Sequence, residues 1–179
     1  DNGLGSTTHV SILDNEGNAA SITTTNGESC GHVLPDTGII LNNMLGEEDL
    51  NPLGFHKWNR IKRMPTLIAP SLLLDKLGNV ELVIGSAGSN RIRSAIIQVM
   101  ANYILKGLSL KDSIYHPRLH LEENFLHIEP GINIDNELNI NSIKTNLFSN
   151  INLFFGGVNA VTENEAIADP RRGGSGIAC

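Results

Sequence analysis

The stretch "GSTTHVSILDNEGNAASITTTNGE", residues 5–28, decides the fold because it predicts a β-hairpin. Apolar and polar residues alternate in two short runs, and the turn-forming letters "DNEGN" separate them. A turn centred on Glu16 fixes the register of the two strands, and in that register Thr7 lies opposite Thr25. The sequence therefore predicts an antiparallel pair that brings two threonines together at its open end.

This register gives the hairpin two faces of different character, since opposed residues share a face. The polar face carries Thr7, His9, Ser11, Ser21, Thr23 and Thr25. The other face is mostly apolar, and we expect it to pack on a core: Thr8, Val10, Ile12, Ala20, Ile22 and Thr24. A threonine nucleophile with an orienting hydroxyl requires a pair such as the one on the polar face. Cross-strand threonine pairs are also ordinary strand chemistry, so the hairpin alone leaves both interpretations open.

The rest of the chain predicts strands on either side of a central pair of helices. Helical spacing of apolar residues and a glycine after them favour a helix over residues 91–107, and Ser109 with Asp112 is typical of the cap of a second helix. Strands are expected over residues 38–43, 66–75, 80–86, 125–129, 153–161 and 166–169, the 66–86 hairpin being apolar enough for burial on both faces. This order predicts one α+β layered domain.

Composition excludes several classes of protein. The 179 residues are 40% apolar, which is enough for one domain with a core. A net charge of −6 argues against a nucleic-acid partner, and no apolar run approaches the roughly 20 residues of a membrane span. Cys30 and Cys179 lack the spacing of metal ligands, and Pro117 breaks the helix that would align His116 with His120. We therefore expect no metal and no transmembrane segment in this chain.

The order of five motifs carries a resemblance to a known family. The opening hairpin is followed by "GIILNNMLGEEDLNP", "APSLLL", "GSAGSNRIRSAI" and "DPRRGG". From about Ser6 to the C-terminus, the chain resembles the small, catalytic subunit of γ-glutamyltranspeptidase, also called glutathione hydrolase. That family belongs to the N-terminal-nucleophile hydrolases.

The resemblance implies an αββα sandwich, of which this chain supplies the small-subunit half. It implies a self-cleaving precursor, a heterodimer with the large subunit from the same precursor, and no cofactor. The activity implied is transfer of a γ-glutamyl group from glutathione or a similar donor to water or an amino acid, through a threonyl acyl-enzyme. Residues 1–6 then form the precursor junction, and residues 7–179 form the small-subunit domain. The family favours a periplasmic or extracellular location, although a cytoplasmic one stays open.

Matching the motifs residue by residue carries the family's site to this sequence. Thr7, the first threonine of "TTH", matches the nucleophile, and Thr25 matches the hydroxyl that hydrogen-bonds it. Asn26, Asn43 and Glu47 match the groups that hold the α-amino and α-carboxylate groups of the donor, with Glu48 and Asp49 as rivals of Glu47. A carboxylate suits an ammonium group in a partly desolvated pocket.

Two further positions complete the predicted site. Gly88 and Ser89 match the pair whose backbone N–H groups form the oxyanion hole, with serine in place of the second glycine. A pair of serines that binds the α-carboxylate in several members reads Thr66–Leu67 here, and the position after "NN" is Met44. These departures weaken the case for tight glutathione specificity.

Two rival interpretations follow from those departures. One is a related acylase or a poly-γ-glutamate-processing enzyme of the same fold. The other is a non-catalytic homologue that acts as a binding module, against which the intact Thr7, Thr25, Asn43 and glycine turn argue.

Overall fold

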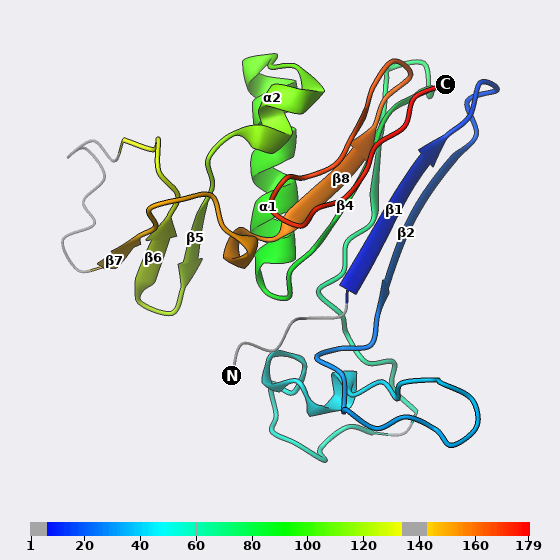
Figure 1. The fold of residues 1–179 in the computed structure, drawn as a ribbon, viewed down its shortest axis with the longest axis vertical. Helices are drawn as coiled ribbons and strands as arrows, with labels where there is room; N and C mark the ends of the chain where they lie inside the picture. The colour runs from blue at the N-terminus through cyan, green and yellow to red at the C-terminus, as the bar shows by residue number, and fades with distance from the viewer. Residues whose placement is uncertain (1–6, 60, 134–142) are drawn as a thin grey trace.

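The computed structural model of the chain describes residues 7–59, 61–133 and 143–179, and the proposed junction, residues 1–6, lies outside them. Its strands are β1 (Thr7–Leu13), β2 (Ala19–Thr25), β3 (Ser71–Leu74), β4 (Val80–Ala87), β5 (Leu119–Glu122), β6 (Phe125–Ile128), β7 (Lys144–Leu147), β8 (Gly157–Val161) and β9 (Ala166–Ile167). Its helices are α1 (Arg91–Met100), which continues into a π-helical turn (Ala101–Leu105), and α2 (Leu110–Tyr115); short 3-10 turns cover Met44–Gly46, Glu48–Leu50 and Leu153–Phe155. Figure 1 shows their arrangement.

The predicted hairpin and its register are confirmed. β1 pairs antiparallel with β2, and Thr7 lies opposite Thr25, His9 opposite Thr23 and so on to the turn. Asp14 stabilises this turn, because its carboxylate accepts hydrogen bonds from the backbone N–H groups of Glu16 and Asn18. Gly17 supplies the positive φ of +84° that the turn requires.

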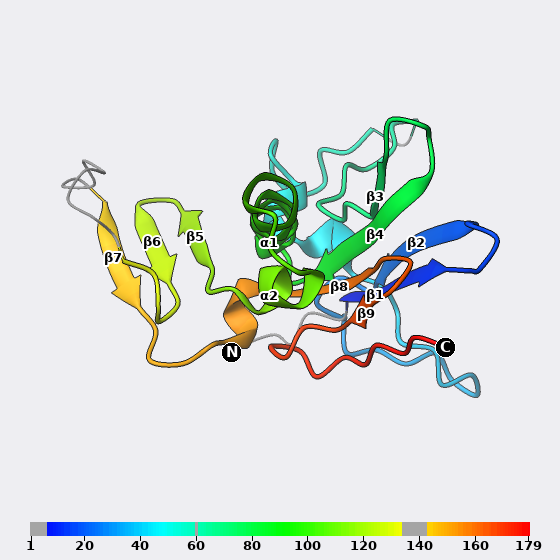
Figure 2. The ribbon, with the colours of Figure 1, turned by 90° about the horizontal axis from the view of Figure 1, so that it is seen from above.

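The core lies between the two helices and one face of the central sheet. In the described residues, this sheet has the order β3-β4-β8-β9. Seen from above in Figure 2, α1 and α2 cover one face of β4 and β8, while the β1–β2 hairpin lies on the other side. The buried cluster holds Leu82, Ile84, Ile92, Ala95, Ile96, Val99, Leu110, Ile114, Val158 and Ala160. The layers are therefore helix, sheet and hairpin.

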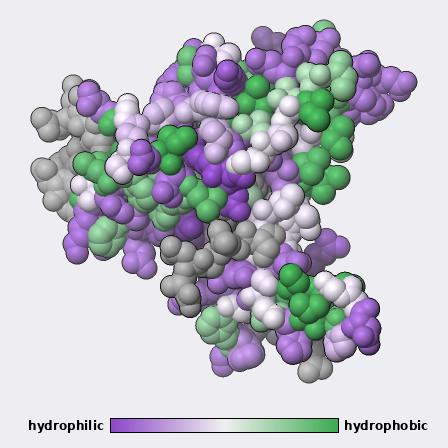
Figure 3. All heavy atoms as spheres, in the orientation of Figure 1, coloured by the Kyte–Doolittle hydropathy of each residue, from purple (hydrophilic) through white to green (hydrophobic). Residues whose placement is uncertain are grey.

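The prediction of which hairpin face meets the core was wrong. The polar face packs on the central sheet: His9 is buried, and the hydroxyls of Ser11 and Ser21 donate hydrogen bonds to the carbonyl oxygens of Asn159 and Ile84. Small polar side chains allow two sheets to approach closely when each hydroxyl finds a partner. The apolar face is exposed instead (Val10 46%, Ile12 50%, Ile22 55%), and Thr8 is exposed with it. Figure 3 shows hydrophobic side chains at the surface over this hairpin.

Other sequence-based expectations have mixed outcomes. The hairpin near residues 66–86 forms as β3 and β4, although β3 is half-buried at alternate residues and exposed at the others, so it is not buried on both faces. The strand expected over residues 38–43 is wrong, because this segment has a single isolated bridge between Val33 and Ile40. β5 and β7 were not predicted; with β6 they make a separate three-stranded sheet on the far side of α1 (Figure 1).

The helix boundaries follow their capping residues. Gly107 adopts a positive φ of +65° after the π-helical turn, and the Ser109 hydroxyl accepts a hydrogen bond from the backbone N–H of Asp112. Both predicted caps are confirmed. In the part of the chain that is described, neither helix has the length and apolar character that crossing a bilayer requires.

Candidate active site

A pair of threonine hydroxyls lies at the open end of the β1–β2 hairpin. Thr7 Oγ1 donates a hydrogen bond to Thr25 Oγ1 over 3.0 Å, and the backbone N–H of Gly27 donates to the same oxygen over 2.9 Å. Two donors therefore fix the Thr25 hydroxyl, and Thr25 in turn orients Thr7. This arrangement directs the lone pairs of Thr7 Oγ1 away from Thr25, as a nucleophile requires.

Thr7 and Thr25 line a cavity of about 970 Å³, the volume of a small-molecule site. Three segments far apart in the sequence meet there: the hairpin end, the acidic loop with Glu47, and the glycine turn with Gly88 and Ser89. The acidic loop and the glycine turn therefore border the same cavity as Thr7. The roles given to these residues stay predictions.

The glycine turn has a backbone that few residues adopt. It connects the buried strand β4 to α1, with φ of +140° at Gly88 and +52° at Ser89. A Cβ on Gly88 would lie 2.6 Å from the Cα atom of Gly156, so glycine is required at that position. Ser89 adopts a left-handed backbone that is uncommon for residues other than glycine. The cavity-lining turn thus has a fixed shape and sits at the start of a helix.

The acidic loop brings three carboxylates to the cavity: Glu47, Glu48 and Asp49. Glu47 is the half-buried one of the three. Burial raises its pKa, and the neighbouring carboxylates of Glu28 and Asp49 raise it further. A cation would relieve both effects, so this is the loop position best suited to an ammonium group.

Gly27 joins this loop to the threonine pair. A Cβ at this residue would lie 2.6 Å from Glu47 Oε1 and 2.6 Å from Asn43 Oδ1. The acidic side chain therefore lies against the residue that hydrogen-bonds Thr25, and it does not point away from the hairpin end.

The remaining predicted binding residues are placed differently. Thr66 lines the cavity, but the side chain of Asn26 is exposed outside the lining. The backbone oxygen of Asn26 accepts a hydrogen bond from the backbone N–H of Asn43, which closes the loop between them. Asn43 does not line the cavity, and its Oδ1 atom is buried beside Gly27 without a hydrogen-bond partner among the described residues.

Sequence reasoning missed two arginines that line the cavity, Arg91 and Arg172. Arg91 lies there with its guanidinium 4.6 Å from the centre of the Phe154 ring and 3.7 Å from the Glu122 carboxylate. Arg172 lines the same cavity, and burial lowers its pKa. Arg91 and Arg172 stood inside two recognised motifs, "GSNRIR" and "DPRRGG", but nothing in either pattern indicated that these arginines face a site.

His9 occupies the layer between the hairpin and the central sheet. Its Nδ1 atom lies 2.7 Å from Thr23 Oγ1 and its Nε2 atom 2.8 Å from Ser11 Oγ. Burial lowers its pKa to about 4, and uncharged groups make up the contacts of its ring: Thr23, Ser11 and the backbone of Gly85. The imidazole is therefore neutral at pH 7 and serves as a hydrogen-bonding spacer.

The lowered pKa of His9 predicts a loss of stability in acid. The folded-state pKa of about 4 lies below the ordinary value of 6.5, so the unfolded chain binds more protons between these pH values. His9 thus stabilises the fold fully above about pH 6.5, and this contribution is lost as the pH falls through about 4. Urea unfolding at several pH values should show this decline, and a His9→Gln variant should show a shallower one. Equal slopes for the two proteins would contradict the prediction.

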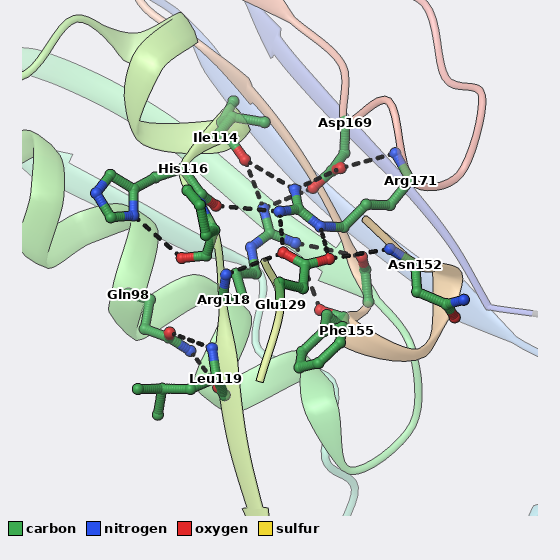
Figure 4. Close-up of polar contacts among 12 residues, drawn as sticks. Gln98, Ile114, His116, Arg118, Leu119, Glu129, Asn152, Phe155, Asp169 and Arg171 are labelled. Carbon is green, nitrogen blue, oxygen red and sulfur yellow. Dashed lines mark hydrogen bonds and ion pairs between the residues drawn. The ribbon is translucent and has the colours of Figure 1, made fainter. Parts of the chain in front are cut away.

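A buried ionic network supports the wall behind the glycine turn (Figure 4). Asp169 accepts a hydrogen bond from Arg118 over 2.6 Å and one from Arg171 over 3.2 Å, and Arg171 also pairs with Glu129. The backbone N–H of Val158 donates to Asp169, and Arg118 donates to the carbonyl oxygen of Gly156. The charges of the two arginines and the two carboxylates thus balance. The network also holds the backbone at Gly156 and Val158, and Gly88 packs on Gly156.

Comparisons place these features among known proteins. Residues 1–179 match the family described as gamma-glutamyltranspeptidase. The chain is 34% identical over 138 residues to the glutathione hydrolase 5 proenzyme of Rattus norvegicus, covering 71% of this chain and 23% of that protein. It is 31% identical over 179 residues to the capsule biosynthesis protein CapD proenzyme of Bacillus anthracis, covering 95% of this chain and 33% of that protein. The chain thus spans between about a quarter and a third of these relatives' length.

A solved structure shares the fold over nearly the whole chain. It is the γ-glutamyltranspeptidase from Pseudomonas nitroreducens complexed with L-DON, with a TM-score of 0.76 and 26% sequence identity. The match covers 96% of this chain and 99% of that chain. The predicted α+β class, as the small-subunit half of an N-terminal-nucleophile hydrolase, is confirmed.

Proposed function

This chain belongs to the γ-glutamyltranspeptidase family, and from that premise we propose that it is the catalytic part of a γ-glutamyltransferase or glutathione hydrolase. The reaction is transfer of a γ-glutamyl group from glutathione or a similar donor to water or to an amino acid. The observation that carries the proposal is the hydroxyl pair of Thr7 and Thr25, 3.0 Å apart, in one cavity with the glycine turn and the acidic loop.

The proposed nucleophile is Thr7. Its hydroxyl attacks the γ-carbonyl carbon of the donor, and its own α-amine, once free, takes the hydroxyl proton and passes it to the leaving amine. The resulting ester is then cleaved by water or by the amine of an acceptor. Thr25 orients the attacking oxygen through the hydrogen bond between the two hydroxyls.

A free α-amine at Thr7 requires cleavage of the bond between Ser6 and Thr7. We propose that a full-length precursor makes this cut itself, through attack of the Thr7 hydroxyl on the preceding carbonyl and hydrolysis of the ester that forms. Residues 1–6 are then the end of the large subunit, which stays bound as the partner chain. The proenzyme names of the rat and Bacillus relatives support this processing.

The glycine turn supplies the proposed oxyanion hole. Backbone N–H groups of Gly88 and Ser89 stabilise the negative charge that develops on the carbonyl oxygen, at about 3–4 kcal/mol for each donor. The close packing of Gly88 on Gly156 supports this role, because donors that are already oriented need no reorganisation during the reaction.

The donor's amino-acid end is proposed to bind at the acidic loop. Glu47 accepts the α-ammonium group, and Thr66 contributes a hydroxyl to the α-carboxylate. The Oδ1 atom of Asn43 is a buried acceptor next to Glu47, which supports a role near the ammonium group. Asn26 contributes by holding Asn43 in place, since its backbone oxygen accepts a hydrogen bond from the backbone N–H of Asn43.

A second candidate is a relative that processes poly-γ-glutamate or another acyl substrate. The similarity to the CapD proenzyme over 95% of this chain favours it, as do Leu67 and Met44 at positions where hydroxyl or polar side chains are common in the family. The chemistry at Thr7 is the same in both candidates, and they differ in the donor.

The test uses the full-length protein with a γ-glutamyl anilide, whose cleavage releases a coloured amine. Release of that amine with a measurable kcat supports γ-glutamyl transfer, and its absence from a correctly folded, processed protein would refute it. A panel of glutathione, γ-glutamyl peptides and poly-γ-glutamate then separates the two candidates by their values of kcat/KM.

Substitution of Glu47 tests the donor site separately. Glu47→Gln removes the charge that binds the ammonium group, so KM for the donor should rise by about 10- to 100-fold with a smaller change in kcat. Glu48→Gln and Asp49→Asn remove a neighbouring charge from the same loop and should change KM by about threefold at most. If one of these controls gives the larger increase, the ammonium group belongs to that residue.

A further inference from the structure

A group of polar contacts centred on His9 and Asn159 joins the hairpin that carries Thr7 to the central sheet. The backbone oxygen of His9 accepts a hydrogen bond from Asn159 Nδ2 over 3.1 Å, and the Ser11 hydroxyl donates to the backbone oxygen of Asn159 over 3.1 Å. Asn159 lies on β8 opposite Gly85 of β4. A Cβ on Gly85 would lie 2.1 Å from the His9 ring, so this ring fills the space above a glycine.

The hydrogen bonds around His9 assign its tautomer. Ser11 has one hydroxyl proton, which goes to the Asn159 carbonyl oxygen, so Ser11 Oγ accepts at its contact with His9 Nε2. Nε2 therefore carries the ring proton, and Nδ1 accepts from the Thr23 hydroxyl. One continuous chain of hydrogen bonds runs from β2 through the imidazole and Ser11 to β8.

Both strands beneath His9 lead directly to the glycine turn. On β4, Gly85 is three residues before Gly88. On β8, Gly157 pairs with Ala87, and the preceding Gly156 packs on Gly88. On the hairpin side, Thr7 is two residues before His9 and on the same face of β1. The contact thus connects the proposed nucleophile to the proposed oxyanion hole through β1, β4 and β8.

We propose that Ser11, His9 and Asn159 form a positioning contact that holds Thr7 at the correct place relative to the Gly88–Ser89 turn. The inference rests on the function proposed above for that site. None of the three residues lines the cavity, so they act on the reaction through the placement of Thr7. Stabilisation of the transition state depends on where the nucleophile lies relative to the N–H groups of the oxyanion hole. Loosening this contact should therefore weaken that stabilisation more than it weakens binding of the γ-glutamyl substrate.

The hairpin offers a matched pair of substitutions. Ser11 and Ser21 lie opposite each other, are both half-buried, and each donates one hydrogen bond to a carbonyl oxygen of the central sheet. Only Ser11 also contacts His9. Ser11→Ala and Ser21→Ala each remove one hydrogen bond to the central sheet, while only Ser11→Ala also removes the contact with His9.

The measurement is steady-state kinetics of the processed full-length protein on a γ-glutamyl anilide. We expect Ser11→Ala to lower kcat and kcat/KM together by about tenfold or more with KM unchanged, and Ser21→Ala to stay within about twofold. Equal losses in the two variants, or none in Ser11→Ala, would overturn the proposal. If Ser11→Ala does not fold, Thr23→Val takes its place, because it removes the hydroxyl that donates to His9 Nδ1 at the other end of this series of hydrogen bonds. The same loss of kcat and kcat/KM is expected for it.

A second readout does not depend on activity. The ring 15N shifts of His9 should report a neutral Nε2–H tautomer in the unsubstituted protein and a changed tautomer equilibrium in Ser11→Ala but not in Ser21→Ala. An inactive unsubstituted protein with this spectrum would refute the proposed function while leaving the contact intact. A charged imidazole at pH 7, or the Nδ1–H tautomer, would refute the contact itself.

Discussion

Replacement of Thr7 by alanine in the full-length precursor should abolish both chain cleavage and γ-glutamyl transfer. The same hydroxyl is proposed to attack the preceding carbonyl during maturation and the γ-carbonyl of the donor during catalysis. Its partner Thr25 offers no substitute, because Thr25 lies within β2 and its nitrogen is a peptide amide that cannot serve as the base. We expect kcat to fall by on the order of 10⁴-fold or more. Gel electrophoresis and anilide release by the purified variant measure the two losses.

Two further variants are controls for Thr7→Ala. Thr7→Ser keeps a hydroxyl and should slow both reactions without ending them. Thr8→Ala removes an exposed side chain that does not line the cavity, so cleavage and activity should persist and the free energy of unfolding should change by about 0.5 kcal/mol at most. An uncut but fully active Thr7→Ala protein would remove the N-terminal-nucleophile mechanism.

Replacement of Arg171 by methionine should cause the largest loss of stability. Arg171 pairs with Glu129 and Asp169, and the side chains of all three are fully buried. Removing one member leaves carboxylate charge uncompensated inside the protein, which costs about 3–5 kcal/mol. Arg118 still pairs with Asp169, so the greater share of this cost falls on Glu129.

Chemical unfolding of the full-length protein measures this loss against Arg93→Met. Arg93 is an exposed residue of α1, and its replacement should change the free energy of unfolding by about 0.5 kcal/mol at most. Equal stability of Arg171→Met and Arg93→Met would show that the network contributes nothing.

Much of the fold was predictable because short-range patterns carry it. Alternation around "DNEGN" fixed the register of β1 and β2, and the apolar spacing from Ile92 to Val99 with the Ser109 cap marked the helices. The same alternation did not predict which face of the hairpin packs on the central sheet. A polar face usually meets water, but here Ser11 and Ser21 find carbonyl partners on β8 and β4, which alternation does not reveal.

The residues of the candidate site also fall into those that the sequence predicted and those that it did not. Thr7, Thr25, Gly88, Ser89, Glu47 and Thr66 line one cavity as the motif order predicts. Asn26 does not, since the chain turns at Gly27 and directs the Asn26 side chain outward. Arg91 lines the cavity from the first residue of α1, and Arg172 lines it from the segment after β9. The pairing of Arg118 with Asp169 joins residues 51 positions apart. No local pattern encodes contacts of that range.

The most direct test of the account is the mass of the processed full-length protein after brief incubation with a γ-glutamyl donor and acid quenching. We expect a smaller chain that begins at Thr7 and carries one γ-glutamyl group, which peptide mapping locates on Thr7. The Thr7→Ala protein should stay uncut and unlabelled. A γ-glutamyl group on any other residue, or turnover of the donor by a chain whose Thr7 nitrogen is still an amide, would contradict it.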